Sequence, residues 1–181
     1  MYIAEQLKKK SVAEYLLYMW QVEDTLRAYG LDAEKMATEY IPQFGLDETK
    51  SEALKGWYES LIQMMREEGV TEKGHLQVNK NIIILLTDLH AQLLKSSKHP
   101  FYSAAYYKAL PFIVVLRAKS AESQEKNEIE NCFDALYGTM LLRAQKKDIS
   151  AETATAIDNI AKFIGMLSDY YKKDKAGEVE F

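Results

Sequence analysis

Two adjacent carboxylates follow an aromatic stretch near the start of the chain, in YLLYMWQVEDTLRAY at residues 15–29. On a helix, Glu23 lies one turn before Arg27 and borders the apolar stripe that contains Met19. As an exposed ion pair, Glu23 and Arg27 would contribute only about 0.3–0.5 kcal/mol. A buried Glu23 would need Arg27 or a tyrosine hydroxyl from another helix, because an unpaired buried carboxylate is costly. The sequence leaves open whether Glu23-Asp24 is a surface feature or a buried functional site.

The histidines and the cysteine do not form a recognised metal or catalytic pattern. Helical di-iron proteins use two Glu-x-x-His pairs, and only Glu72 and His75 have that spacing. His75, His90 and His99 are never three or four residues apart, although a site assembled from separate helices stays geometrically possible. Cys132 has no cationic neighbour in sequence to activate it. Gly-x-Ser-x-Gly, Gly-x-Gly-x-x-Gly and phosphate-binding loops are absent. We predict no catalytic residue, no metal and no cofactor.

The chain contains 12 tyrosines, and several of them lie in FYSAAYYKALP at residues 101–111. One interpretation is a core helix that is kinked at Pro111 and has its tyrosine hydroxyls at the rim. The alternative is a ligand pocket between helices, in which Trp20, Glu23 and Tyr107 line one cavity. The candidate ligand-binding residues are Trp20, Glu23, Arg27, Tyr106 and Tyr107.

Composition favours one helical domain. The 181 residues are 48% hydrophobic and 28% charged, which is typical of a globular protein that can bury a core without disulfides. Only 8 glycines and 3 prolines are present, fewer than an all-β protein with many tight turns would need. We expect a single domain at residues 1–175 and a frayed tail at 176–181.

Charge and hydropathy restrict the partners and the compartment. A net charge of −4 argues against general binding of nucleic acid. The opening MYIAEQLKKK has the reverse order of a secretory signal, and the longest uncharged apolar run, residues 109–116, is too short to span a bilayer. A single cysteine suits a reducing compartment. We expect a cytoplasmic protein that begins at its own Met1 and does not insert into a membrane.

Apolar periodicity predicts helices throughout the chain. Gly30 and Gly69 end two of them, and Thr71 is the expected cap of the fourth. The run ALPFIVVL at residues 109–116 would also fit a buried strand, but a lone strand has nothing to pair with. We therefore predict an all-α antiparallel bundle of about six or seven helices, with a long first helix and a kinked central helix at Pro111. The expected helices cover about 3–28, 33–41, 51–68, 101–119, 123–147 and 151–173, and the fourth, which follows Thr71, carries Val78, Ile82, Leu85 and Leu89.

The segment AEYLLYMWQVEDTLRAYGLD, residues 13–32, resembles the opening of an uncharacterised family of bacterial proteins catalogued as a domain of unknown function. The resemblance extends over the chain, with most of its specificity in the first 12 of these residues. It implies a small, all-helical, cytoplasmic bacterial protein. It assigns no activity, so no site residue is transferred from the family.

Three functions are compatible with these patterns. The first is a non-enzymatic module that acts through protein–protein contact, as a homo-oligomer, because tyrosine, tryptophan and methionine are enriched at interfaces. The second is a protein that binds a small apolar or aromatic ligand near Trp20, Glu23 and Tyr107. The third is a metal-dependent enzyme with a dispersed site, which pairs His90 or His75 with Glu23 or Asp88.

Overall fold

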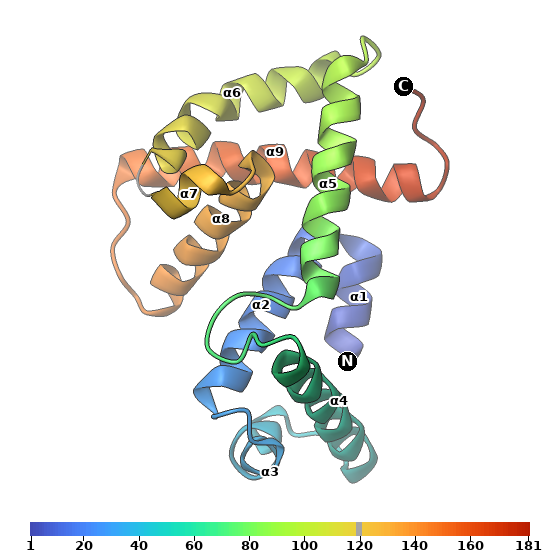
Figure 1. Cartoon of the computed structure of the whole chain (residues 1–181), viewed down its shortest axis with the longest axis vertical. Coiled ribbons are helices and arrows are strands. Elements are labelled where there is room, and N and C mark those ends of the chain that lie inside the picture. The colour runs from blue at the N-terminus through green and yellow to red at the C-terminus, as the bar shows by residue number, and fades with distance from the viewer. Residues whose placement is uncertain (119–120) are drawn as a thin grey trace.

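The structure is a computed structural model that describes residues 1–118 and 121–181, and every regular element in these ranges is helical (Figure 1). The predicted all-α helical bundle is confirmed; the antiparallel arrangement of its helices stays a prediction. The end of the predicted helix 101–119, at Lys119, lies outside the described residues. The elements are α1 (Tyr2–Lys10), α2 (Val12–Ala28), α3 (Ala33–Lys35), a π-helical turn (Met36–Tyr40), a 3-10 turn (Ile41–Phe44), α4 (Glu48–Glu67), α5 (Gln77–Lys95), α6 (Pro100–Arg117), α7 (Ala121–Glu125), α8 (Glu128–Ala144) and α9 (Ala151–Lys175).

The prediction of one long first helix is wrong, because the chain breaks at Ser11. This residue has extended backbone angles (φ −154°, ψ 117°) and separates α1 from α2. Its hydroxyl accepts a hydrogen bond from the Glu14 amide at 3.3 Å and lies 3.1 Å from the hydroxyl of Ser168 on α9. Ser11 therefore caps the second helix and joins it to the last one.

The predicted helix 123–147 is also divided, into α7 and α8. Asn127 separates them, and its side chain accepts a hydrogen bond from the Glu130 amide at 2.9 Å. Thr71 does not cap a helix, since residues 71–76 form a loop and α5 starts at Gln77. These local breaks explain why the structure has more helices than the six or seven that we predicted.

The helix α6 is not buried in the centre of the molecule. Pro111 lies inside it, and Figure 1 shows that this helix changes direction along its length. Tyr102, Ala109 and Ile113 face the core, whereas Tyr107 and Val114 are exposed. The central position belongs instead to α9, which contacts α2, α5, α6 and α8. The apolar run 109–116 is thus a helix with one exposed apolar face.

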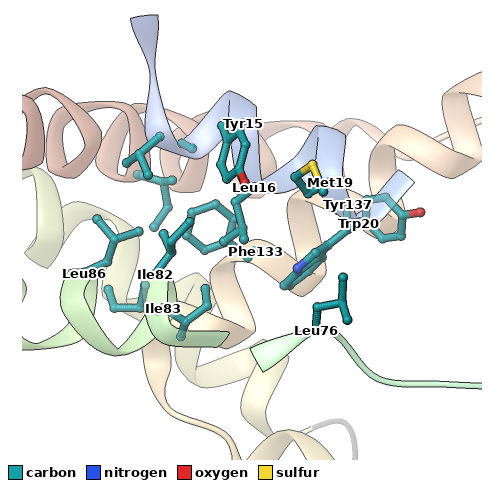
Figure 2. Packing of buried hydrophobic residues seen from close by; sticks show 14 of the residues in the cluster. Tyr15, Leu16, Met19, Trp20, Leu76, Ile82, Ile83, Leu86, Phe133 and Tyr137 are labelled. Carbon is teal, nitrogen blue, oxygen red and sulfur yellow. The ribbon is translucent and has the colours of Figure 1, made fainter. Parts of the chain in front are cut away.

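One cluster of buried hydrophobic side chains extends from Ala4 in α1 to Leu167 in α9. In Figure 2, side chains of α2, α5 and α8 meet around Leu16 and Phe133, and Trp20 lies beside Tyr137 and Leu76. The single domain at residues 1–175 and the frayed tail at 176–181 stay predictions.

The last residues fold back toward the connection between α5 and α6. Residues 178–181 are not helical, and the His99 side chain donates from Nε2 to the carbonyl of Glu180 at 2.9 Å. The ring of Phe181 lies 6.2 Å from the His99 ring. Among the helices at residues 1–118 and 121–181, none is both long enough and apolar enough to cross a membrane.

Candidate functional site

Glu23 is a fully buried carboxylate at the inner face of α2, with 0% of its surface exposed. It lies on the same helix face as Trp20 and Arg27, so all three reach toward the segment that precedes α5. Its Oε1 accepts hydrogen bonds from the Leu76 amide at 3.1 Å and from Asn79 Nδ2 at 2.7 Å. Its Oε2 lies 2.6 Å from His75 Nδ1. Three donors therefore replace the water that Glu23 loses on burial.

His75 is fixed from two directions. Its ring stacks on the Trp20 indole, with the ring centroids 4.0 Å apart and the planes 10° from parallel. A carboxylate offers only acceptors, so in the pair with Glu23 the proton is on His75 Nδ1. His75 Nε2, which makes no hydrogen bond to a residue in the described ranges, is left as a proton acceptor in the neutral ring. Such an oriented imidazole is able to take up a proton from a bound molecule.

The side chain of Arg27 holds the loop 71–76 through hydrogen bonds to backbone carbonyl groups. Its guanidinium donates to the Val70 carbonyl at 3.1 Å and to the Gly74 carbonyl, and it forms an ion pair with Asp24 at 2.7 Å. The second Asp24 oxygen accepts a hydrogen bond from the Tyr137 hydroxyl at 2.6 Å. The predicted partners of Glu23, an arginine and a tyrosine, thus belong to Asp24. Glu23 therefore forms neither the exposed ion pair with Arg27 nor a buried contact with Arg27 or a tyrosine, the two possibilities that the sequence left open.

A pocket of about 220 Å³ lies between α2, the loop 71–76, α5 and the start of α8. It is partly enclosed, and Ile83 and Ile84 provide an apolar wall. The polar side chains around it come from Trp20, His75, Gln77, Asn79, Lys80, Asn127 and Glu130. Asn127 is positioned by its capping bond to α8, and Asn79 by its bond to Glu23.

Two residues that line this pocket each have one buried polar atom without a hydrogen-bond partner among the described residues: Trp20 Nε1 and Asn79 Oδ1. The orientation of the Asn79 amide is chemically determined, because its nitrogen must face the carboxylate of Glu23. Its oxygen is therefore a true unpaired acceptor. A buried polar group without a partner costs about 1–3 kcal/mol, so the unpaired donor and the unpaired acceptor each lower the stability of the fold.

Glu130 adds a half-buried carboxyl group that has no ion pair or side-chain hydrogen bond to the part of the chain that the structure describes. Loss of solvent raises the pKa of Glu130 above its usual value of 4.5, an effect that the nearby Lys126 opposes. His75 and Lys80 also act on Glu130 by their charge, which places these groups within electrostatic reach of one another across the pocket.

A family model described as "Domain of unknown function (DUF4924)" matches residues 1–178. The chain belongs to this family. No curated protein and no solved structure matches the chain.

The DUF4924 chain brings only part of the predicted site together. Trp20 lines the pocket, Glu23 lies behind it and Arg27 fastens its loop. Tyr106 and Tyr107 do not line it: the hydroxyl of Tyr106 donates to Glu128 at 2.8 Å, and Tyr107 is 63% exposed on α6. The expected single cavity shared by Trp20, Glu23 and Tyr107 is therefore not what the structure contains.

The other histidines and the cysteine belong to separate environments. His90 Nδ1 lies 2.6 Å from the Tyr102 hydroxyl, and burial lowers the pKa of His90. Burial likewise raises the pKa of the Cys132 thiol far above its usual range. Of the pairs that we considered for an enzyme, His75 with Glu23 is the one that forms. Within the described ranges, no group of three or more His, Cys, Asp and Glu side chains is arranged to hold a metal ion.

Sequence reasoning missed Asn79, Lys80 and Glu130 in this DUF4924 site. Asn79 carries a usable signal, because it lies three and four residues before Ile82 and Ile83 and so shares the buried stripe of α5. A polar residue on such a stripe needs a buried partner. Lys80 and Glu130 carry no comparable signal, since each lies in an ordinary charged first turn.

Proposed function

We propose that this protein binds a small polar molecule in the pocket beside Trp20 and His75. The observation that carries the proposal is the polar lining of a partly enclosed pocket, where Lys80 and Glu130 carry charges without an ion pair among the described residues. A polar ligand would compensate these charges, which an apolar ligand of the kind first expected would not.

The pocket is also held in shape by its surroundings. Glu23 fixes His75 and Asn79, and Arg27 fixes the backbone at Val70, just before the loop, and at Gly74 inside it. A preformed site spends less free energy on ordering when a ligand binds. This network therefore supports a binding role rather than a loop that only connects two helices.

A comparison of two neighbouring substitutions tests the proposal. Ile84 lines the pocket and is 52% exposed, whereas Leu85 is 43% exposed and does not line it. Ile84→Trp should fill the pocket, and Leu85→Trp should leave it open; both side chains face solvent, so neither change should prevent folding. We expect ligand-detected NMR of a fragment library to find compounds that bind the wild-type and Leu85→Trp proteins but not Ile84→Trp.

Failure of the library to give any such compound would overturn the proposal. Equal loss of binding in Leu85→Trp and Ile84→Trp would also overturn it, because the effect would then not come from this pocket.

A second candidate function is self-association through α6. Its exposed face is apolar over most of its length, with Tyr107, Pro111, Val114 and Val115 exposed and Phe101 82% exposed at the first turn. A contiguous exposed patch of this kind marks interaction sites. The proposed partner is a second copy of the chain, as in most oligomers of soluble proteins.

Sedimentation velocity tests the second function. Val114→Lys on α6 should shift the protein toward a monomer, while Val78→Lys, at an exposed valine of α5, should leave the association unchanged. A wild-type protein that stays monomeric at concentrations well above those in a cell would exclude this role.

We also propose that the protein works in the cytoplasm. Cys132 is the only cysteine, so no disulfide can form within the chain. Its side chain is buried. This usage suits a reducing compartment. The net charge of −4 supports a ligand other than nucleic acid.

A further inference from the structure

The pocket beside Trp20 carries two opposite charges that do not neutralise each other. Lys80 lies in the first turn of α5 and Glu130 in the first turn of α8, and both line the pocket. Neither forms an ion pair with the other, or with any residue of the described parts of the chain. Opposite charges that stay separate across a small site are available to a ligand that carries both signs.

The two charges match the two charged groups of such a ligand. The ammonium group of Lys80 matches a carboxylate, and the carboxylate of Glu130 matches an ammonium group. The pocket therefore offers one group of each sign.

The rest of the pocket restricts the size and polarity of the ligand. Ile83 and Ile84 provide an apolar wall, and the volume of about 220 Å³ is below the range of drug-sized sites. A peptide separates its terminal charges by a chain of atoms, whereas a free amino acid carries both charged groups on the α-carbon that also bears its side chain.

We propose that the ligand is a free α-amino acid with an apolar side chain. Its carboxylate pairs with Lys80, its ammonium group pairs with Glu130, and its side chain contacts Ile83 and Ile84. This inference rests on the proposed binding function and names the chemical class of the ligand.

Isothermal titration with three related compounds tests the class. L-leucine carries both charges, L-leucinamide lacks the carboxylate, and 4-methylpentanoate lacks the amine. The wild-type protein should bind L-leucine, or another apolar amino acid of a first panel with valine, methionine and phenylalanine, at least about ten times more tightly than the two matched analogues.

Two substitutions assign the charges separately. Lys80→Gln should weaken binding of L-leucine and 4-methylpentanoate while leaving L-leucinamide unchanged, and Glu130→Gln should weaken L-leucine and L-leucinamide while leaving 4-methylpentanoate unchanged. Lys9→Gln and Glu178→Gln, at exposed positions outside the pocket, serve as controls and should change none of the three affinities.

The outcomes separate the two proposals. If fragments bind wild type but not Ile84→Trp while no amino acid binds, the ligand class is wrong and the pocket keeps its function. If an amino acid binds but Lys80→Gln and Glu130→Gln affect all three compounds equally, the assignment of the charges is overturned. If nothing binds, both proposals fail.

Discussion

At the scale of single residues, Glu23 determines how the N-terminal and middle parts of the chain meet. Its carboxylate is buried, yet it accepts hydrogen bonds from a histidine, a backbone amide and an asparagine of a segment more than 50 residues away. Hydrogen bonds to a charged acceptor are stronger than neutral ones. This one side chain therefore joins α2 to the segment that precedes α5.

Glu23→Gln tests that role. The amide keeps the shape of the side chain but presents a donor where His75 or Asn79 already donates, so we expect the free energy of unfolding to fall by about 1–3 kcal/mol. Urea denaturation followed by circular dichroism measures the change. Glu14→Gln, in the exposed first turn of the same helix, should change stability by less than about 0.5 kcal/mol. Equal effects of the two substitutions would contradict the buried network.

The sequence predicts some of these residues and not their partners. Glu23 borders the apolar stripe of its helix, which indicates partial burial, and its spacing from Arg27 suggests a pair. The actual partner of Arg27 is Asp24, at the shorter spacing of three residues, and the partners of Glu23 lie in a distant loop. A spacing rule describes contacts within one helix only, so it cannot supply contacts that depend on how helices pack.

At the scale of elements, short polar side chains decide where helices begin. Ser11 and Asn127 each interrupt a stretch whose apolar pattern is compatible with one longer helix, and each accepts a hydrogen bond from the amide three residues later. The glycines that end α2 and α4 were predicted, because a helix often ends at a residue with a positive φ angle, which glycine adopts readily. Gly30 and Gly69 have φ angles of 72° and 69°. A single serine or asparagine is a weaker signal, since these residues also occur inside helices.

Ser11→Ala tests the first break. Loss of the cap on α2 and of the contact with Ser168 should lower the free energy of unfolding by about 1 kcal/mol. Ser60→Ala, in the interior of α4, removes a hydroxyl that donates only to the preceding turn and should be nearly neutral. The comparison uses urea midpoints of the two variants. A Ser11→Ala protein that is as stable as the wild type would contradict the capping role.

The loop 71–76 is an element without regular structure that is nevertheless fastened at both ends. Arg27→Gln removes the donors to Val70 and Gly74, so we expect faster amide hydrogen exchange in this loop while the amides of α9 keep their protection. Arg143→Gln, near the exposed end of α8, is the control and should not change exchange in the loop. Unchanged protection of the loop in Arg27→Gln would show that Glu23 alone holds it.

At the scale of the whole molecule, the prediction of the central helix was wrong, because it relied on the apolar run 109–116. A helix that is apolar on all sides is usually buried. Here the chain places α9 in the middle and leaves one apolar face of α6 exposed. The sequence contains no sign of this choice, because an apolar face looks the same whether it meets the core or a second molecule.

Stability of the whole fold should depend on pH through His90. Burial lowers the pKa of His90 in the folded state, whereas in the unfolded chain it is about 6.5. Below that pH the unfolded chain takes up a proton that the folded protein does not, so stability should fall as the pH falls from about 7 to 5. Urea midpoints across this range should show the loss, and His90→Gln should reduce its slope. A variant with the same slope as wild type would exclude His90 as the cause.

The stacking of Trp20 on His75 has an optical consequence. The chain has two tryptophans, and Trp57 on α4 does not line the pocket. In a Trp57→Phe protein, all indole fluorescence would come from Trp20, whose ring centroid lies 4.0 Å from that of the His75 imidazole. Any molecule that displaces this imidazole should change the emission of Trp20, so occupancy of the pocket becomes visible without a label.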